Sequence, residues 1–225
     1  MIPLYHDFSD ETVLVFGGGA VGARKAVRFA DEARVVVVSP AFDERLTDLA
    51  GGSSAAEGSE PVELVRAAPD ADAVREWIDR LAPALVVAAT DDAAVNAAAE
   101  AGALDAGALV NRTDVPGERA VGSVVVPATV DDDPVRVALS TGGASPALSK
   151  ALRERIESEI DGAGAMAELS GELRTELKAR EIPPADRRKA IRRVVRSEGV
   201  WKALHEGESN ARQEAYSVIE EVLSQ

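Results

Sequence analysis

The residues of this sequence best suited to binding an anion are the glycines of Gly17-Gly18-Gly19-Ala20-Val21-Gly22. They follow an apolar run of strand length, Thr12 to Phe16, and open a segment with helical apolar spacing. In the G-x-G-x-x-G pattern the first glycine permits a tight turn, the second lets a pyrophosphate approach the backbone, and the third lets the helix pack closely on the strand. The pattern predicts a dinucleotide site that uses Gly17, Gly19 and the N–H groups of Ala20, Val21 and Gly22. The alternative is a glycine-rich turn without a ligand.

The second apolar run, Arg34 to Val38, ends at Ser39-Pro40-Ala41, where this pattern places the adenosine ribose. The fingerprint expects an acidic side chain about 20 residues after the first glycine, to hold the ribose 2′-hydroxyl. Ser39 offers a hydrogen bond without a charge, and no arginine directly follows the strand to receive a 2′-phosphate. We therefore expect Ser39, Pro40 and Ala41 to line the cofactor site, while NAD versus NADP stays open. Asp43 and Glu44 fit better as first-turn charges of a helix from Phe42 to Ala50.

Polar residues also stand where three further apolar runs end. The segments are Ala88-Ala89-Thr90-Asp91-Asp92, Val110-Asn111-Arg112-Thr113-Asp114 and Leu139-Ser140-Thr141-Gly142-Gly143-Ala144-Ser145-Pro146. Ligands bind at the carboxyl ends of strands in open α/β sheets, so these residues are candidates for ligand contact. Thr90 is a candidate for the cofactor, and Asn111, Ser140, Thr141 and Gly142 are candidates for a substrate. Helix capping by Thr90-Asp91 and by Ser145-Pro146 is the alternative role.

The elements that must position these residues alternate between strand and helix in the first part of the chain. Apolar runs predict strands at Thr12–Phe16, Arg34–Val38, Val62–Val65, Leu85–Ala89 and Ala108–Val110, and the apolar spacing predicts helices at Ala20–Ala30 and Asp91–Asp105. Nearly continuous apolar strands joined by helices predict an α/β fold with a Rossmann-like parallel sheet, covered on both faces. Gly51 to Ser59 predicts a surface loop. The last third of the chain has the spacing of successive helices.

The charge of the chain excludes some partners. Its 225 residues carry 39 Asp and Glu against 25 Lys and Arg, a net charge of −14, which argues against nucleic acid. The absence of cysteine excludes disulfides, thiol catalysis and cysteine-ligated metals. Every apolar run is shorter than the roughly 20 residues of a membrane span, and there is no signal-peptide pattern, so we expect a cytoplasmic protein. The 20 Arg and 5 Lys favour a halophilic protein of high-salt cytoplasm, and an ordinary acidic protein is the alternative.

The charge is also uneven along the chain. Residues 1–150 hold 12 basic and 24 acidic side chains, whereas residues 151–225 hold 13 and 15. This difference indicates two units with a junction near Ser140 to Ser145.

The order of these segments resembles the precorrin-2 dehydrogenase/sirohydrochlorin ferrochelatase family of siroheme biosynthesis. The resemblance spans about residues 2–160 and rests on Gly17-Gly18-Gly19 with Arg24-Lys25, Ala88-Ala89-Thr90-Asp91-Asp92, Val110-Asn111 followed by Asp114, Val126-Pro127-Ala128 and Ser140-Thr141-Gly142-Gly143-Ala144-Ser145-Pro146. It implies NAD-dependent oxidation of the tetrapyrrole precorrin-2 to sirohydrochlorin. In some members ferrous iron is then inserted to give siroheme.

The resemblance also implies a domain organisation and a homodimer. We expect an NAD-binding Rossmann domain at residues 1–113, a dimerisation region at 114–145 and a helical C-terminal domain at 146–225. The dimerisation region is expected to hold an antiparallel hairpin from Ser123 to Ser140 that turns at Asp131-Asp132-Asp133-Pro134.

The essential carboxylate of the family, in its Asn-x-x-Asp segment, falls on Asp114 here. Oxidation by hydride transfer also releases a proton, so a carboxylate beside the substrate acts as general base. The same carboxylate is suited to taking the pyrrole protons displaced by iron. A turn residue before Val115-Pro116-Gly117 is the alternative role of Asp114. We expect no resident metal, because the only histidines, His6 and His205, belong to no ligand-spaced cluster.

The basic residues of the last third form one cluster. Arg188, Arg192 and Arg196 recur every four residues, which on a helix makes a cationic stripe. Precorrin-2 carries eight carboxylates, so we expect Arg188 and Arg192 to help bind it, with a solvated helix face as the alternative. Two other functions stay open for the whole chain: a chelatase with a vestigial nucleotide site, and a non-catalytic module that senses NAD and NADH.

Overall fold

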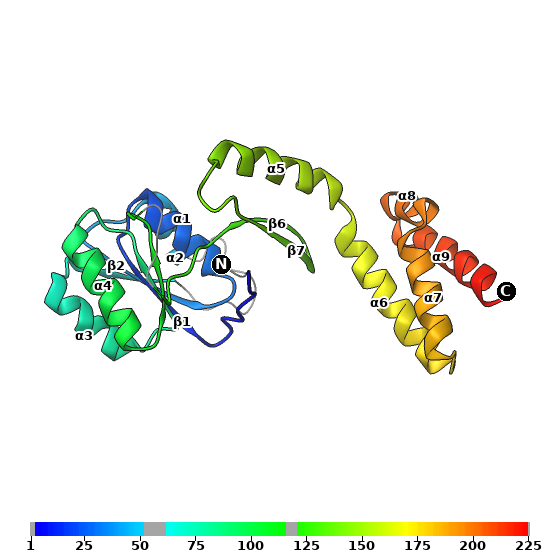
Figure 1. The fold of residues 1–225 in the computed structure, drawn as a ribbon, viewed down its shortest axis with the longest axis horizontal. Helices are drawn as coiled ribbons and strands as arrows, with labels where there is room; N and C mark the ends of the chain where they lie inside the picture. The colour runs from blue at the N-terminus through cyan, green and yellow to red at the C-terminus, as the bar shows by residue number, and fades with distance from the viewer. Residues whose placement is uncertain (1–2, 52–61, 116–120, 225) are drawn as a thin grey trace. The chain divides into compact units, whose positions relative to one another are not determined.

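The computed structural model describes residues 3–51, 62–115 and 121–224, and the chain divides into two compact units, Met1–Val126 and Pro127–Gln225 (Figure 1). The first unit contains, in chain order, β1 (Thr12–Phe16), α1 (Ala20–Phe29), β2 (Arg34–Ser39), α2 (Glu44–Ala50), β3 (Glu63–Arg66), α3 (Ala71–Leu81), β4 (Leu85–Ala88), α4 (Ala93–Asp105) and β5 (Leu109–Arg112). The expected loop after Gly51 and the turn residues Pro116-Gly117 lie outside the described residues.

The five strands form one parallel sheet in the order β3-β2-β1-β4-β5. Val15 on the central strand pairs with Val37 of β2 and Val87 of β4, and all three are fully buried. Burial on both faces explains why the strands are continuous apolar runs. The predicted Rossmann-like parallel sheet is confirmed.

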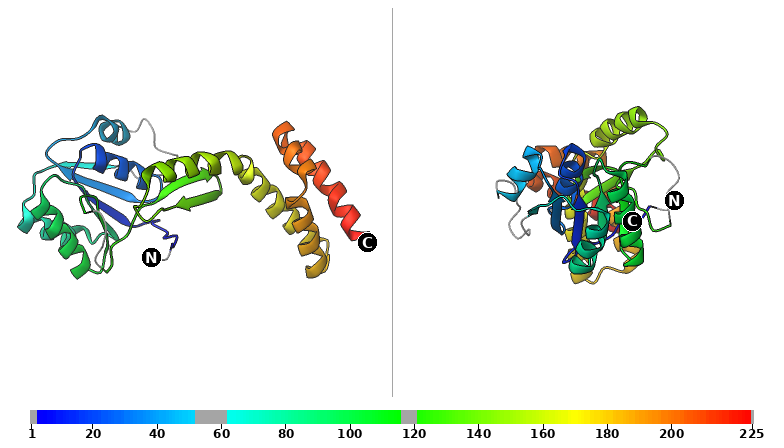
Figure 2. Two further views of the ribbon diagram at one scale, coloured as in Figure 1. Left: turned by 45° about the horizontal axis from the view of Figure 1, so that its top comes forward. Right: turned by 90° about the vertical axis from the view of Figure 1, so that its left-hand side faces the viewer.

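Alternation along β1 sends side chains to two separate cores. Val13 and Val15 pack with residues of α1 and α2, whereas Leu14 and Phe16 pack with residues of α3 and α4. Figure 2 shows helices on both faces of the sheet. Truncating a fully buried side chain such as Leu14 to alanine costs about 2–5 kcal/mol, so the sheet is a rigid support for the loops at its edge.

Two helices begin later than their apolar spacing predicts, because an aspartate caps each of them. The Asp43 carboxylate accepts a hydrogen bond from the Arg45 N–H at 3.1 Å, so α2 begins at Glu44. The Asp92 carboxylate accepts from the Ala94 N–H at 2.7 Å, so α4 begins at Ala93. The alternative role of Thr90-Asp91 as the helix cap is therefore wrong.

The second unit begins with an antiparallel hairpin and continues as helices. Its elements are β6 (Ala128–Asp132), β7 (Val135–Leu139), α5 (Pro146–Glu159), α6 (Ala163–Ala179), α7 (Pro184–Val195), α8 (Glu198–Glu206) and α9 (Glu208–Leu223). The hairpin turns at Asp133-Pro134, within the predicted turn, but it begins at Ala128 instead of Ser123. Ser123 instead forms a parallel bridge with Val110, and the Val124 N–H donates to the Val110 carbonyl at 2.8 Å. The described residues 121–126 therefore extend the first unit.

The helical part of the second unit has its own core, to which α6, α7, α8 and α9 contribute. The Gly164 N–H at the start of α6 donates to the Asp132 carboxylate of the hairpin at 2.9 Å. This bond ties the hairpin to the helices, so the compact division falls earlier than the junction that the charge pattern indicates. Ser145 caps α5 by accepting from the Leu148 N–H at 3.2 Å, with Pro146 at the first helical position, as expected.

Candidate active site

A tight turn after β1 lies against the end of β4. Gly17 has φ of +107°, and a side-chain carbon there would lie 2.3 Å from the Ala89 carbonyl oxygen. A side-chain carbon at Gly22 would lie 1.8 Å from the Gly17 carbonyl oxygen, so only glycine allows α1 to approach the turn this closely. The order of strands reverses between β1 and β4, so the turn stands at the switch point where open α/β sheets bind ligands.

The turn opens to solvent at Gly19. A side-chain carbon at Gly19 would meet no described atom within 4 Å, and Ala20 and Val21 are exposed. Gly19 caps α1 without a side-chain hydrogen bond, and the first turn of α1 holds no acidic residue. The first N–H groups of the helix and the positive end of its dipole therefore face an open space that fits a pyrophosphate. The residues present fit a dinucleotide such as NAD.

The end of β2 lies beside this turn. A side-chain carbon at Gly18 would lie 2.4 Å from the Ala41 carbonyl oxygen and 2.9 Å from the Ser39 Cβ. Ser39 is buried and Ala41 is exposed. The structure thus brings the predicted ribose-end residues, Ser39, Pro40 and Ala41, next to the glycine turn.

Sequence reasoning did not identify Arg66, at the end of β3. The sheet register pairs Arg66 with Ser39, and its guanidinium donates to the Pro40 carbonyl at 2.8 Å. The guanidinium carbon also lies 5.3 Å from the centroid of the Phe42 ring, which is cation–π distance. A cation therefore stands beside the predicted ribose-end residues. Only the register of β2 with β3 reveals it, because 26 residues separate Arg66 from Pro40.

Asp114 follows β5 and is held by a bidentate ion pair. The Arg112 guanidinium donates from Nε to Oδ1 of Asp114 at 3.0 Å and from Nη2 to Oδ2 at 2.6 Å. Its remaining nitrogen, Nη1, donates to Oε2 of Glu100 in α4 at 3.0 Å. Only 13% of the Arg112 side chain is exposed, which keeps its guanidinium group in one position. The carboxylate of Asp114 is therefore fixed at the carboxyl end of β5.

The pKa of the Asp114 carboxyl lies below its ordinary value. The hydrogen bonds from Arg112 lower this pKa most, burial raises it, and the Asn96 amide lowers it further. The same pairing with Asp114 is the main cause that raises the pKa of Arg112. Asp114 is therefore an ionised carboxylate at neutral pH, the form that accepts a proton.

Asn96 holds the loop that follows β4. Its buried amide donates to the Thr90 carbonyl at 2.9 Å, and the Thr90 hydroxyl donates to Oδ1 of Asn96 at 2.7 Å. The hydroxyl and the N–H of Thr113 both donate to the Ala88 carbonyl, at 3.1 and 3.0 Å. These bonds bring Thr90 and Asp114 to the sheet edge that carries the glycine turn.

Asn111, predicted to contact substrate, is buried in the structure. Its amide donates to the Val124 carbonyl at 2.7 Å, which fixes the chain beside β5. Its Oδ1 accepts no hydrogen bond from any described residue although it is buried. A donor at that position would lower the cost of burying this acceptor.

The remaining predicted substrate residues belong to the second unit, whereas Asp114 and the glycine turn belong to the first. Ser140 accepts from the Gly142 N–H at 3.1 Å, and the Thr141 hydroxyl bonds the Ser149 hydroxyl at 2.9 Å. Ser140 and Gly142 are exposed, as are Arg188 and Arg192 on α7.

No group of three or more His, Cys, Asp or Glu among the described residues is placed to hold a metal ion. None of the helices in the described part of the chain has the length and apolar character needed to cross a membrane.

Comparison with known proteins gives matches along most of the chain. A family model described as NAD(P)-binding matches residues 4–128, and one described as sirohaem biosynthesis protein central matches residues 132–159. The precorrin-2 dehydrogenase of Methanosarcina barkeri is 32% identical over 223 residues, which cover 99% of this chain and 95% of that protein. Siroheme synthase 1 of Aeromonas salmonicida is 35% identical over 213 residues, which cover 92% of this chain but only 41% of that protein.

A solved structure titled "SirC, precorrin-2 dehydrogenase" matches with a TM-score of 0.72 and 21% identity, covering 98% of this chain and 100% of that one. This match shows a shared fold. A dinucleotide cradle at the switch point of a parallel sheet is typical of Rossmann dinucleotide-binding proteins, and the chain falls in this class. Within the class it belongs to the precorrin-2 dehydrogenase family of siroheme biosynthesis, as its sequence predicts.

Proposed function

We propose that this chain oxidises precorrin-2 to sirohydrochlorin with NAD. The observation that carries the proposal is the position of Asp114 at the edge of the sheet. Thr113 bonds the Ala88 carbonyl at the end of β4, and Gly17 lies against Ala89, the next residue. An ionised carboxylate and a dinucleotide cradle therefore share one edge of one sheet, which is the arrangement that hydride transfer coupled to proton removal requires.

In this mechanism the nicotinamide supplies a hydride acceptor when NAD is bound. The N–H groups of α1 bind the pyrophosphate, and Ser39, Pro40, Ala41 and Thr90 line the rest of the cofactor site. Asp114 accepts the proton that leaves the substrate together with the hydride. Arg112 keeps the carboxylate ionised and oriented. Ser140, Thr141 and Gly142 contact the tetrapyrrole.

The test is anaerobic incubation with precorrin-2 and NAD while NADH absorbance is followed. We expect wild type to form NADH, and we expect Asp114→Asn to lose about 100-fold or more in kcat, the contribution of a positioned general base. The matched control is Asp105→Asn, which removes a surface carboxylate of the same unit that pairs only with exposed Arg75 among the described residues. If wild type binds NAD but forms no NADH, the dehydrogenase function is wrong. Undiminished kcat in Asp114→Asn contradicts the role of Asp114.

Insertion of ferrous iron into sirohydrochlorin is a second candidate activity of the same site. Its support is the ionised Asp114, since iron enters a tetrapyrrole only as two pyrrole protons leave, and this carboxylate accepts one proton at a time and releases it to solvent before the next. The macrocycle nitrogens then supply the coordination. Adding ferrous iron after the oxidation and following the siroheme spectrum tests this activity. If Asp114→Asn inserts iron at the wild-type rate into preformed sirohydrochlorin, the carboxylate does not serve this step.

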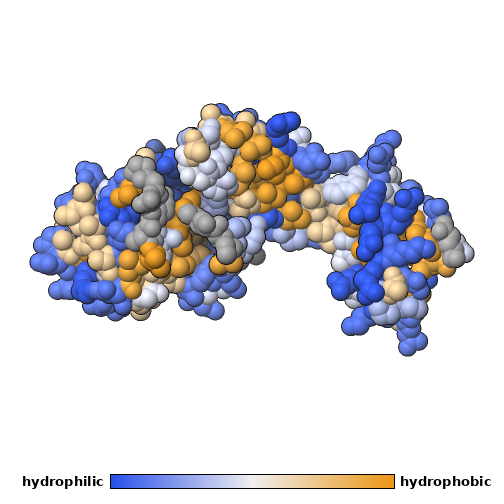
Figure 3. Space-filling model, in the orientation of Figure 1, coloured by the Kyte–Doolittle hydropathy of each residue, from blue (hydrophilic) through white to orange (hydrophobic). Residues whose placement is uncertain are grey.

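We further propose that the protein is a cytoplasmic homodimer from a high-salt cell. Support for the dimer comes from the second unit, where α5 has no buried residue and Val130 is the only buried residue of the described hairpin strands. Figure 3 shows hydrophobic surface gathered over α5 and the hairpin. Support for the high-salt cell comes from the net charge of −14 and from an excess of arginine over lysine. The proposed use of NAD supports the cytoplasmic location.

A further inference from the structure

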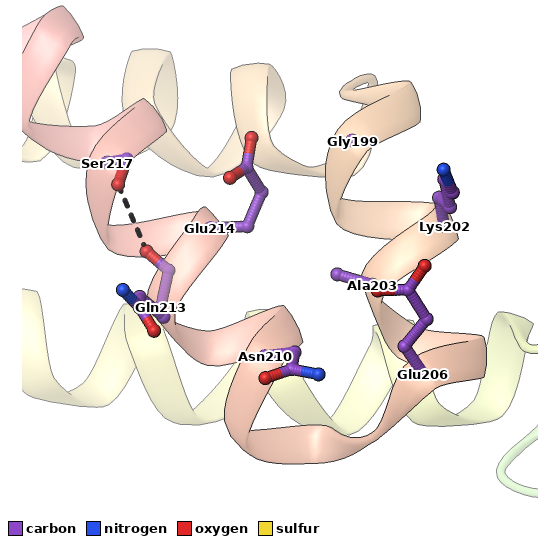
Figure 4. Close-up of a pocket in the computed structure, with 8 residues that line it drawn as sticks. All are labelled: Gly199, Lys202, Ala203, Glu206, Asn210, Gln213, Glu214 and Ser217. Atoms are coloured by element: carbon purple, nitrogen blue, oxygen red, sulfur yellow. Dashed lines mark hydrogen bonds between the residues drawn. The ribbon is translucent and has the colours of Figure 1, made fainter.

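Described residues of the helical part of the second unit line a hollow on α8 and α9 and another on α7 and α9, and the two differ in charge. The first, of about 380 Å³, lies between α8 and α9 and is lined by Lys202, Glu206 and Glu214 among other residues (Figure 4). The Ser217 hydroxyl in this hollow already donates to the Gln213 carbonyl. Its two carboxylates outnumber its one cation, so this hollow does not favour an anion.

The second hollow, of about 430 Å³, lies along α7 and the end of α9. We call it the basic groove, and it is lined by Ala185, Arg188, Lys189, Arg192, Arg193, Arg196, Glu221 and Val222. Five of these residues are cations, and Glu221 is the single carboxylate among them. The cationic stripe that the spacing of Arg188 and Arg192 predicts therefore lies along a concave surface.

These five cations lack partners within the described part of the chain: none forms an ion pair or a side-chain hydrogen bond with a described residue. Arg212, on α9, shows the opposite behaviour, since it pairs with Glu172 and Glu176 of α6. In a chain with 39 acidic residues, five neighbouring cations without ion pairs are not explained by charge neutralisation.

Helix stability explains only part of the cluster. Arg192 and Arg193 lie in the last turn of α7, where cations interact favourably with the helix dipole. Arg188 and Lys189 lie in the middle of the helix, where this effect has faded. A ligand with several negative charges would account for the two cations in the middle of the helix as well as for the two in its last turn.

We propose that the basic groove binds carboxylates at one edge of the anionic tetrapyrrole, which deepens and rests on the function proposed above. A volume of about 430 Å³ is too small to enclose a macrocycle with eight carboxylates, so the groove holds side-chain carboxylates and leaves the ring outside. Arginine suits this role because its planar fork binds a carboxylate through two parallel hydrogen bonds. Such contact pairs persist in concentrated salt, where steering over distances beyond about 3 Å is screened.

The test is direct binding of uroporphyrin, a stable tetrapyrrole with eight carboxylates, to the full chain, followed by porphyrin fluorescence. We expect Arg188→Gln/Arg192→Gln to raise the Kd about tenfold, the effect of losing two exposed charge pairs. The matched control is Arg174→Gln/Arg180→Gln, which removes two exposed arginines, one in α6 and one directly after it, that do not line the groove. We expect the Kd of this control to stay within about twofold of wild type. Equal Kd values for the two double variants overturn the proposal.

A second pair of variants has the opposite expected sign. Glu221→Gln removes the only carboxylate of the groove lining, so we expect it to lower the Kd about twofold to threefold. Glu220→Gln removes the preceding exposed carboxylate, which does not line the groove, and we expect no change. If both variants tighten binding equally, net charge and not the groove controls affinity, and the proposal fails.

Enzyme kinetics separate this proposal from the proposed function. We expect Arg188→Gln/Arg192→Gln to raise the KM for precorrin-2 while the KM for NAD stays unchanged. A wild-type chain that forms no NADH contradicts the dehydrogenase function. If wild type forms NADH but the double variant has the wild-type KM for precorrin-2 and the wild-type Kd for uroporphyrin, the dehydrogenase function stands. Only the proposed role of the basic groove is then contradicted.

Discussion

Arg112 sets the basicity of the Asp114 carboxylate, because its fork engages both oxygens. The carboxyl whose pKa is lowered stays ionised to lower pH than an ordinary aspartate, and Arg112 is the largest cause of this shift. Replacing Arg112 with Gln removes that cause, so the pKa of Asp114 rises toward its ordinary value. We expect the acid limb of the kcat/KM profile against pH to move to higher pH. Rates across pH for wild type and Arg112→Gln measure the shift.

Arg75→Gln is the control for this prediction, because Arg75 pairs with Asp105 on the surface of the same unit and does not contact Asp114. We expect its profile to match wild type. An unmoved acid limb in Arg112→Gln means that Asp114 is not the group that titrates in the rate. If kcat of Arg112→Gln falls at every pH while the acid limb stays in place, Arg112 orients the carboxylate of Asp114 and does not set its pKa.

At the scale of residues, sequence motifs identify candidate site residues but do not reveal which side chains contact them. Asp114 is identifiable from its place after Asn111, yet the pairing of Arg112 with Asp114 and Glu100 depends on how β5 lies against α4. Arg66 reaches Pro40 only through strand register. Side-chain contacts across a sheet have no short-range pattern in the sequence, which is why the contacts of these two cations were not predicted.

At the scale of elements, Gly22 and Gly19 at the start of α1 have different roles: Gly22 is required for packing, and Gly19 leaves space for a ligand. Gly22→Ala would place a carbon 1.8 Å from the Gly17 carbonyl oxygen, so α1 must shift from β1. We expect a fall in Tm of roughly 5 °C or more, since overpacking costs about 1–3 kcal/mol or more. Gly19→Ala meets no described atom within 4 Å, so we expect its Tm to stay within roughly 2 °C of wild type.

Binding of NAD distinguishes the two roles. The added methyl group of Gly19→Ala occupies the space assigned to the pyrophosphate, so we expect the Kd for NAD to rise about tenfold or more without loss of fold. Thermal unfolding and NAD titration of both variants check these results. If Gly19→Ala binds NAD as wild type does, the pyrophosphate does not lie at this turn.

The strands of the first unit and its helices α1, α2 and α4 were predictable because burial imposes a pattern on them, whereas α3 was not predicted. The buried runs Thr12–Phe16 and Leu85–Ala88 are apolar at nearly every position. Helix starts were less predictable, since Asp43 and Asp92 compete with neighbouring polar residues for the cap. The start of the hairpin was wrong because Ser123 pairs with a distant strand, and the sequence does not encode this pairing locally.

The elements α5, β6 and β7 provide a test of the proposed dimer. An isolated two-stranded hairpin is marginally stable, and Leu148 on α5 is 50% exposed. We expect light scattering to give wild type a mass of twice 23.5 kDa, and Leu148→Glu to shift it to the monomer mass. The control is Val27→Glu on α1, where Val27 is 43% exposed in the first unit. A monomeric wild type, or a dimeric Leu148→Glu, contradicts this interface.

At the scale of the whole molecule, the net charge of −14 makes the folded chain repel itself. Salt shortens the Debye length from about 8 Å at physiological ionic strength to about 3 Å at 1 M, which screens repulsion between surface carboxylates. We therefore expect Tm to rise by roughly 5–15 °C between about 0.15 M and 2 M KCl.

A variant with fewer surface carboxylates separates this repulsion from general salt effects. Asp48, Glu76 and Asp79 are exposed and form no ion pair with any described residue, so Asp48→Asn/Glu76→Gln/Asp79→Asn lowers the negative charge without breaking a contact. Less repulsion remains for salt to screen, so we expect this variant to be more stable than wild type at low salt and to gain less Tm from KCl. If KCl raises the Tm of the two proteins equally, the proposed adaptation through surface charge is contradicted. The salt effect then comes from hydrophobic burial, which the three substitutions leave unchanged.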